Sequence, residues 1–141
     1  MRAVILSISL MLGIPAGVAA EPGADAAKSY RVETAGTTLA VAAGGAGKLV
    51  LSIVPLADTH VHPQAPLKIA LSGTAGLKLA REALQRKDAV DPKAEGPRFE
   101  VPFTAVAAGA QEARAKIEFY LCAADWCARQ TRDVSVRIDV K

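Results

Sequence analysis

The sequence predicts a single all-β domain that folds as an antiparallel sandwich. Short runs of apolar residues alternate with polar residues at a period of two, which is the pattern of half-buried strands. Turn-forming residues separate these runs at intervals of roughly 8 to 15 residues, and no long helical pattern interrupts them. Together these observations favour about seven to eight short strands arranged as an immunoglobulin-like β-sandwich.

The composition limits what such a domain can do. The chain has 141 residues, of which 51% are hydrophobic, so it can bury a true core within one domain. Only one Trp, two Tyr and three Phe are available, so Val, Leu, Ile and Ala must build most of that core. The formal charge is +3, and both signs are interspersed along the chain, so we expect no nucleic-acid partner.

The first twenty residues have the pattern of a secretory signal peptide. Arg2 is followed by the apolar run Ala3–Leu12 and then by small residues that end in Val18-Ala19-Ala20. We expect cleavage near Ala20, and the alternative is an uncleaved anchor. The small residues are not followed by Cys, which argues against a bacterial lipoprotein anchor. The mature chain is therefore expected to be periplasmic or secreted, without stable membrane insertion after cleavage. Residues 21–29 are expected to form a flexible leader, and residues 30–141 the domain.

Several runs in the first half of the chain have strand patterns. In Lys48–Val54 both alternating sets of side chains are largely apolar, which is typical of a central strand buried on both faces. In Leu67–Leu71, alternate large aliphatic side chains are expected to point inward. Before them, Tyr30–Glu33 and Thr38–Ala42 are expected to form a first pair of short extended segments.

The middle of the chain contains more loop signals. Pro55–Pro66 is predicted to be a loop, and Lys87–Pro97 an exposed connection, because both carry prolines. Leu77–Arg86 fits the start of a strand followed by a helical turn. Arg98–Thr104 alternates strictly, and its Pro102 favours an edge strand, because proline has no N–H for a ladder hydrogen bond.

The final third of the chain predicts a β-hairpin. Lys116–Leu121 and Val134–Val140 each place large apolar side chains on one face and polar side chains on the other, so we expect them to be antiparallel partners. The segment that joins them contains the two cysteines of the chain, Cys122 and Cys127. A six-residue cysteine loop is therefore predicted at the hairpin tip.

The cysteine loop is the first candidate site. Export would place Cys122 and Cys127 where a disulfide can form and persist. A ring of six residues stabilises a fold by only about 2 kcal/mol, so the bridge is either a modest staple or a pair open to thiol–disulfide exchange. Trp126 could shield the sulfurs or dock a partner, or it could fill the end of the core. Asp125 could move a proton during exchange, or it could be a turn residue.

The histidines are a weaker candidate site. His60 and His62 lie on the same side of an extended segment, and a His-x-His pair can bind copper or zinc together with the reduced thiolates of Cys122 and Cys127. The alternative is that the two imidazoles make hydrogen bonds within the loop. Nucleophile-elbow, phosphate-loop and His-Glu-x-x-His motifs do not occur in the sequence, and no cofactor is expected.

Three segments give the chain a family resemblance. HVHPQAPLKI, then RFEVPF after a charged connection, then IEFYLCAADWC and a last alternating strand resemble the amino-terminal domain of the thiol:disulfide interchange protein DsbD and its stand-alone relatives. The resemblance covers about residues 30 to 141. It implies an immunoglobulin-like sandwich in the bacterial periplasm, with a cysteine pair that accepts electrons from a membrane partner and passes them to oxidised periplasmic proteins. Cys122 and Cys127 match that pair.

The resemblance extends to residues around the cysteines. Phe119 and Tyr120 match the family's aromatic-rich strand end, and His60 and Pro66 match a family-like His and Pro. His62 stands where the family pattern leads us to expect Asn. The ring is one residue shorter than in DsbD itself, and the membrane-embedded and thioredoxin-like parts of DsbD have no counterpart in this sequence. Electrons would therefore come from a separate membrane protein, or the domain would keep the fold and a static bridge without redox turnover.

Two hypotheses about function follow. In the first, the protein is an exported thiol–disulfide exchange protein, and therefore a thiol:disulfide oxidoreductase. It would exchange electrons with thioredoxin-like or other periplasmic redox proteins through Cys122 and Cys127, and the family's pattern assigns the carrying role to Cys127. In the second, it is a non-catalytic binding or accessory module with a permanent bridge, including a form that handles copper or zinc.

Overall fold

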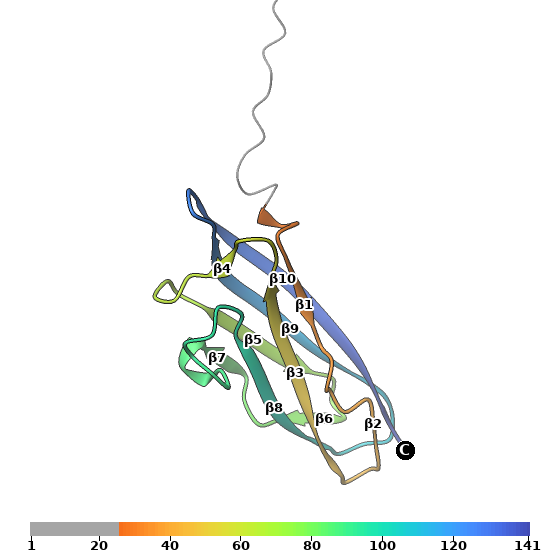
Figure 1. Ribbon diagram of the computed structural model, residues 1–141. Helices are drawn as coiled ribbons and strands as arrows, with labels where there is room; N and C mark the ends of the chain where they lie inside the picture. The colour runs from red at the N-terminus through yellow and green to blue at the C-terminus, as the bar shows by residue number, and fades with distance from the viewer. Residues whose placement is uncertain (1–25) are drawn as a thin grey trace, which may run out of the picture.

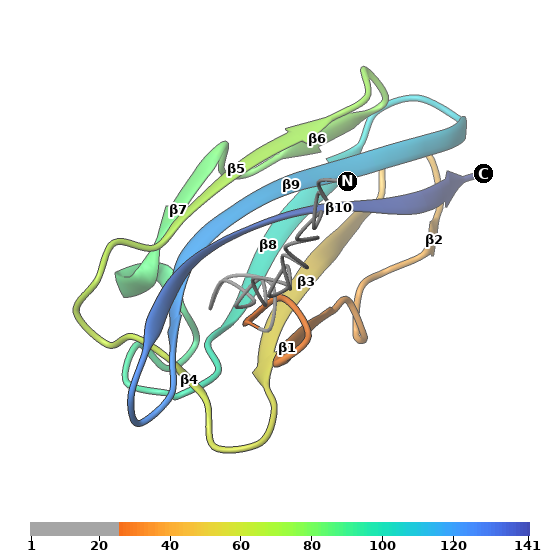
Figure 2. The same ribbon diagram turned by 90° about the horizontal axis from the view of Figure 1, so that it is seen from above.

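The computed structural model describes residues 26–141, and they form the predicted immunoglobulin-like β-sandwich. The two sheets face each other, as Figures 1 and 2 show. The first sheet has four strands in the order β1 (Tyr30–Glu33), β3 (Ala46–Pro55), β8 (Arg98–Ala105) and β6 (Leu77–Leu79). The second has six strands: β2 (Ala40–Val41), β10 (Cys127–Val140), β9 (Gly109–Cys122), β5 (Lys68–Gly73) and β7 (Ala83–Gln85) in that order, with β4 (His60–Val61) also paired to β9.

The expected signal peptide, residues 1–20, lies outside the described residues. So does most of the expected leader, and its described part is packed against the domain. Ala26 is fully buried, and the Ser29 N–H donates a hydrogen bond to the Ala26 carbonyl at 3.0 Å. Within residues 26–141 there is no helix long and apolar enough to cross a membrane.

The core lies between the two sheets and is mainly aliphatic, as the composition predicted. Alternate residues of each long strand point into it, and on β9 the largest of these are Ile117, Phe119 and Leu121, each at most 1% exposed. The Phe119 ring meets the ring of Tyr30 edge to face, with centroids 5.0 Å apart. This contact ties β9 of the second sheet to β1 of the first, close to the end of the sandwich that carries the cysteines.

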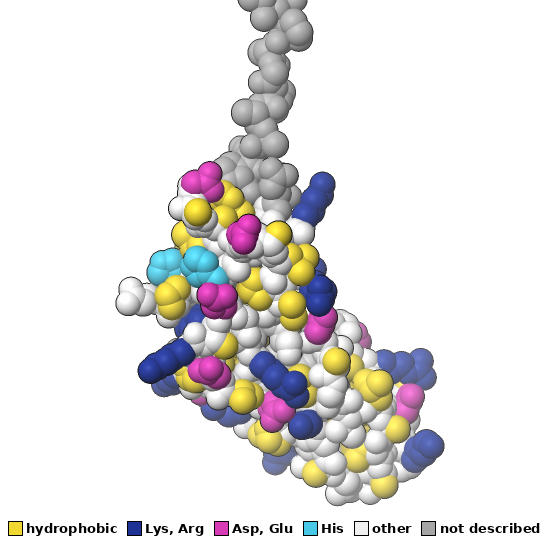
Figure 3. Space-filling model, viewed as in Figure 1, with side chains coloured by type: hydrophobic (Ala, Val, Ile, Leu, Met, Phe, Trp, Pro, Cys, Tyr) yellow, Lys and Arg dark blue, Asp and Glu magenta, His cyan; other side chains and the backbone are white. Residues whose placement is uncertain are grey.

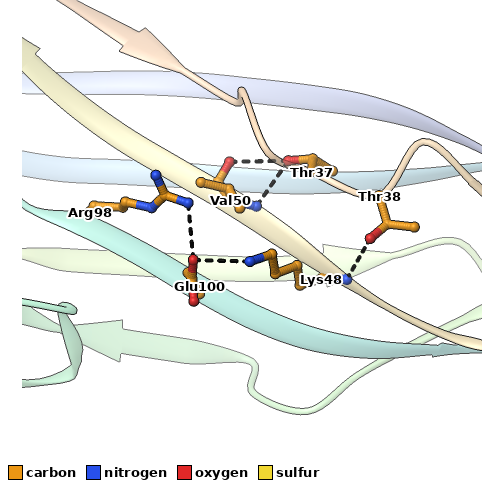
Figure 4. A network of polar contacts seen from close by, with 6 residues as sticks. All are labelled: Thr37, Thr38, Lys48, Val50, Arg98 and Glu100. Atoms are coloured by element: carbon orange, nitrogen blue, oxygen red, sulfur yellow. Dashed lines mark hydrogen bonds and ion pairs between the residues drawn. The ribbon is translucent and has the colours of Figure 1, made fainter.

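The prediction that Lys48–Val54 is buried on both faces is confirmed. Val50 points away from the core, yet it is fully buried. Figure 4 shows the cause: the Thr37 hydroxyl accepts from the Val50 N–H at 2.9 Å and donates to the Val50 carbonyl at 3.3 Å. Gly36, with φ of +95°, makes the turn that brings this segment over Val50, where Arg98 also lies close.

The segments Tyr30–Glu33 and Thr38–Ala42 are both extended, but they belong to different sheets. β1 pairs with β3, whereas β2 pairs in parallel with β10. Between them, Thr38 continues the pairing along β3, because its N–H donates to the Lys48 carbonyl and its hydroxyl accepts from the Lys48 N–H. The chain then crosses from the first sheet to the second.

The prediction that Arg98–Thr104 is an edge strand is wrong, because β8 lies between β3 and β6. The backbone of Pro102 faces β6 and not β3, since the Pro102 carbonyl accepts the N–H of Ala80. β6 ends at Leu79, just before this position. The missing N–H of Pro102 therefore falls where the neighbouring strand stops, and the ladder with β3 is kept.

The helical turn predicted within Leu77–Arg86 is also misplaced. β6 begins at Leu77 as expected, but Ala83–Gln85 forms β7, in which the buried Leu84 is the register partner of Ile69 on β5. The single turn of 3-10 helix follows at Arg86–Asp88. The spacing of the apolar residues was compatible with both a helix and a strand. Pairing with β5 stabilises the strand.

Candidate functional site

The hairpin that carries the cysteines is the longest in the fold. β9 and β10 pair over 14 register positions, from Gly109↔Val140 to Cys122↔Cys127. The predicted hairpin is therefore confirmed, and it is longer than the sequence pattern indicated. At its tip the Ala123 N–H donates to the Trp126 carbonyl at 2.8 Å, which closes the loop.

Cys122 and Cys127 form a disulfide between directly opposed residues of the two strands. Their Cα atoms are 4.0 Å apart. Directly opposed residues project their side chains from the same face of a sheet. Because Phe119 and Leu121 point into the core, Cys122 and its partner lie on the outer face of the second sheet. The bridge is therefore outside the hydrophobic core.

The two cysteines differ in exposure. Cys122 is 2% exposed, whereas Cys127 is exposed. Cys122 lies on the middle strand, with β4 on one side and β10 on the other. At the level of Cys127 β10 is the outermost strand of the described sheet, because β2 pairs only with Asp139 and Val140. Within the part of the chain that is described, the bridge is thus exposed to solvent on the side of Cys127.

The structure brings His60 to the bridge. β4 pairs antiparallel with β9, and His60 is the register partner of Cys122. The His62 N–H donates to the Tyr120 carbonyl at 2.8 Å, which extends this pairing by one more position. His60, Cys122 and Cys127 therefore occupy one row across three adjacent strands. Figure 1 shows β4 beside the end of the hairpin, and Figure 3 shows the histidine side chains gathered toward that end of the molecule.

His62 has a role in holding its loop. Its Nδ1 accepts hydrogen bonds from the backbone N–H groups of Gln64 and Ala65, at 3.0 and 2.8 Å. The Arg86 guanidinium donates to the His62 carbonyl at 3.2 Å and to the Ala94 carbonyl at 2.8 Å, so it joins two loops beside β4. His62 therefore makes the hydrogen bonds within the loop that the alternative interpretation of the histidines predicted.

The structure does not assemble the metal site considered from the sequence. In the part of the chain that is described, no group of three or more His, Cys, Asp or Glu side chains is arranged to hold a metal ion. Both sulfurs are engaged in the disulfide, so they are not present as thiolate ligands.

The other candidate residues of the hairpin tip have different positions. Trp126 is half-buried and packs against the core, as the alternative interpretation of this residue has it. Asp125 is exposed in the loop. Tyr120 is half-buried on the outer face, two residues before Cys122 and opposite Arg129 on β10. Tyr120 and Arg129 are therefore the closest outer-face neighbours of the bridge along the two strands.

A shallow pocket reaches Tyr120 and Arg129, which lie two residues along the strands from the bridge, and neither cysteine lines it. Its volume is about 120 Å³, and it is lined by Pro66, Lys68, Glu118, Phe119, Tyr120 and Arg129. The Arg129 guanidinium forms an ion pair with the Glu118 carboxylate at 3.4 Å. Pockets that hold drug-sized ligands have volumes of roughly 300 to 1,000 Å³, so this one is too small for such a ligand.

Sequence reasoning missed Arg129. It joined the histidines to the cysteines only in the metal hypothesis, and it did not predict the strand that pairs His60 with Cys122. The signal in the sequence is the apolar Val61 between two polar residues; in the structure it is 1% exposed and belongs to the short strand β4. A strand of two residues is too short to show a period, so the pattern alone could not separate it from the loop around it.

The fold and the site define an immunoglobulin-like β-sandwich with a disulfide at the tip of its longest hairpin. No protein-family model matches this chain, and no curated protein sequence matches it. Solved structures with a similar fold include native alpha-2-macroglobulin from Escherichia coli, at 20% identity over 79% of this chain and 6% of that chain, with a TM-score of 0.47. A lipoprotein from Bacteroides thetaiotaomicron is similar at 10% identity over 94% of this chain and 86% of that chain, with a TM-score of 0.44. The chain thus spans only a small part of the macroglobulin, and the similarity is one of fold alone.

Proposed function

We propose that this protein is an exported thiol–disulfide exchange protein that passes electrons through Cys122 and Cys127. The observation that carries the proposal is the asymmetry of the bridge: Cys127 is exposed at the edge of the sheet, and Cys122 is 2% exposed beside it. Exchange requires an external thiolate to approach one sulfur in line with the bond. The arrangement offers Cys127 for that attack and keeps Cys122 as the leaving sulfur.

The exchange reaction needs only this protein and one partner that carries two thiols, and its electrons and protons balance between the two. A partner thiolate attacks Sγ of Cys127, the bond between Cys122 and Cys127 breaks, and Cys122 leaves as a thiolate. The second thiol of the partner, as its thiolate, then attacks the partner's sulfur in the mixed disulfide, and Cys127 is released. The partner loses two electrons and two protons, and this protein gains them as two thiols. The reverse sequence reduces an oxidised partner.

The scaffold supports exchange by staying rigid while the bond opens. The strands on both sides of the bridge are held by backbone ladders that do not depend on the sulfur–sulfur bond, since β9 pairs with β10 on one side and with β4 and β5 on the other. The two thiols would therefore stay opposed after reduction. An opposed pair closes again faster than a pair in a mobile loop, because little chain entropy is lost on closure.

The expected compartment and partners follow from the sequence. The signal-peptide pattern of residues 1–20 favours export, and an oxidising compartment is where such a pair can cycle. The partner class we propose is a thioredoxin-like or other periplasmic redox protein, with a separate membrane protein as the source of electrons.

A reduction potential tests the proposal. The oxidised protein is equilibrated with a dithiothreitol or glutathione series, and the fraction reduced is read by alkylation and mass. We expect a potential above about −300 mV, where exchanging bridges lie, and a structural bridge would lie below that value. A C122A/C127A variant serves as the blank for alkylation.

The second candidate function is a non-catalytic accessory module with a permanent bridge. The burial of Cys122 favours it, because a cysteine that is 2% exposed is poorly reached by reductants. Its metal-handling form needs the reduced thiols to bind copper or zinc together with His60. Titration of the reduced protein with Zn²⁺ and with Cu⁺ tests this form, and the exchange proposal predicts no tight binding of either ion.

A further inference from the structure

We propose that His60 stabilises the thiolate of Cys122 when the bridge opens, and so acts as a positioning residue for exchange. This inference rests on the proposed function and adds to it a residue on another strand. It is carried by the register of three strands, which places His60 directly opposite Cys122 and Cys127 directly opposite Cys122 on the other side.

The geometry puts the imidazole at the leaving sulfur and not at the attacked one. Directly opposed residues of an antiparallel pair have Cβ atoms about 4.5 to 5.5 Å apart and share one face. Cys122 therefore has His60 as its neighbour on β4, and Cys127 is one strand further away. His60 is half-buried, and among residues 26–141 no hydrogen bond or ion pair is formed by its imidazole. The ring is thus available to the sulfur beside it.

The chemistry of the leaving group explains why a neighbour is needed. When Cys127 is attacked, Cys122 receives the electron pair of the broken bond and becomes an anion. Burial of a thiolate disfavours the charged form and raises the pKa of the thiol. Cys122 is 2% exposed, so it would be a poor leaving group without compensation. An adjacent imidazolium supplies the opposite charge and favours the thiolate.

Other charged and titratable groups surround this row, but none of them is the register partner of Cys122 on β4, as His60 is. Arg129 lies beside Cys127 on β10 and is paired with Glu118. Arg86 lies beside β4, and its guanidinium donates to the backbone carbonyls of Pro92, His62 and Ala94 and not to the row. The remaining groups near the bridge are Tyr120 on β9, Asp125 in the cysteine loop, Asp58 before β4, and Glu95, whose carbonyl accepts the N–H of Val61. Apart from the phenol of Tyr120 these remaining groups are carboxylates, which disfavour a nearby thiolate. His60 is therefore the group on β4 that can supply positive charge to Cys122.

The position of the proton differs between opening and closing of the bridge. With His60 protonated, Cys122 leaves as a thiolate and forms an imidazolium–thiolate pair. With His60 neutral, the thiol of Cys122 can give its proton to the imidazole before it attacks in the closing direction.

The test measures the pKa of Cys122 in the reduced protein. Alkylation by iodoacetamide is followed at each cysteine by mass spectrometry over a range of pH, and thiolate absorbance at 240 nm in a C127S variant gives the same quantity without need of access. His60→Asn is the test variant. His62→Asn is the matched control, because it also removes an imidazole from the same loop while Asn keeps an acceptor for the N–H groups of Gln64 and Ala65.

We expect His60→Asn to raise the apparent pKa of Cys122 by about one unit and His62→Asn to leave it in place. His60→Lys, which keeps a positive charge, should restore the lower value. A merely structural role for His60 would not follow charge in this way. If His60→Asn does not fold, His60→Gln is measured instead.

The inference is overturned if His60→Asn leaves the pKa of Cys122 unchanged, or if His62→Asn moves it by the same amount. The reduction potential of the unmodified protein separates this result from failure of the proposed function. A potential above about −300 mV with an unmoved pKa removes only the role of His60. A potential below that value removes exchange, whatever the pKa does.

Discussion

Opening the bridge should leave the sandwich folded, and this is the physical requirement of a protein that exchanges electrons in both directions. The perturbation is the removal of the sulfur–sulfur bond, either by a reductant or in a C122A/C127A variant. The disulfide closes a ring of only six residues, from Cys122 to Cys127. The chain-entropy relation for a ring of that size gives a loss of about 2 kcal/mol.

The structure explains why the loss should not exceed this value. The residues on either side of the bridge are held by other interactions: β9 and β10 pair over 14 positions, and β4 pairs with β9 opposite Cys122. Phe119 and Leu121, just before the bridge, are each at most 1% exposed in the core. For a domain of this size, about 2 kcal/mol corresponds to a fall in Tm of roughly 6 to 12 °C.

Urea and thermal denaturation of the oxidised protein, the reduced protein and the C122A/C127A variant measure this difference. We expect the reduced protein and the variant to agree with each other and to unfold cooperatively with an unchanged m value. Loss of more than about 4 kcal/mol, or a reduced protein that is unfolded at 25 °C without denaturant, would refute the reasoning. The bridge would then be a structural staple.

Three further predictions concern the scaffold. Phe119→Ala should lower the free energy of unfolding by about 3 to 5 kcal/mol in urea melts, because it removes a fully buried ring, whereas Leu39→Ala at a 58% exposed position should change it by less than about 0.5. Arg86→Ala should cost about 2 kcal/mol in the same melts and increase amide hydrogen exchange at the loops it joins, since its guanidinium donates to three backbone carbonyls. The pKa of Glu100 is lowered, first by the hydrogen bond from Lys48, so the folded state gains stability that is present above the unfolded pKa and is lost as pH falls through the folded one. Between about pH 6 and about pH 3, the urea midpoint should therefore fall by slightly more in the unmodified protein than in Glu100→Gln. An equal fall in the two proteins would contradict this assignment.

The hairpin could be predicted from the sequence because its signals are local. The alternation of large apolar residues through Ile117 and Leu121, and again through Val136 and Ile138, specifies two strands that each bury one face. Two cysteines in the short connection then fall at its tip. These features need no knowledge of the rest of the chain, and the structure confirms them.

The errors arise where a distant partner decides the outcome. Pro102 favoured an edge strand, and the structure accommodates it in a central strand because β6 ends just where the missing N–H would be needed. Leu84 fitted a helical turn, and its pairing with Ile69 makes it part of a strand. No pattern within either segment reports where its neighbouring strand begins or ends.

The site shows the same division. Cys122 and Cys127 could be identified from their spacing, but their unequal exposure depends on which strands flank each one. His60 could be singled out by residue type alone, and its position beside Cys122 depends on the pairing of β4 with β9, between residues 62 positions apart. The row of three side chains is therefore a property of the fold.

The most direct test of the account is to find which sulfur a partner attacks. The oxidised protein is mixed with a thioredoxin-like protein that keeps its nucleophilic cysteine and has its second cysteine replaced by serine. An alkylating reagent then traps the freed thiol, and the complex is mapped by mass spectrometry. We expect the partner to be bonded to Cys127 and the alkyl label to be on Cys122. A partner bonded to Cys122, or no mixed disulfide at any partner concentration, would contradict it.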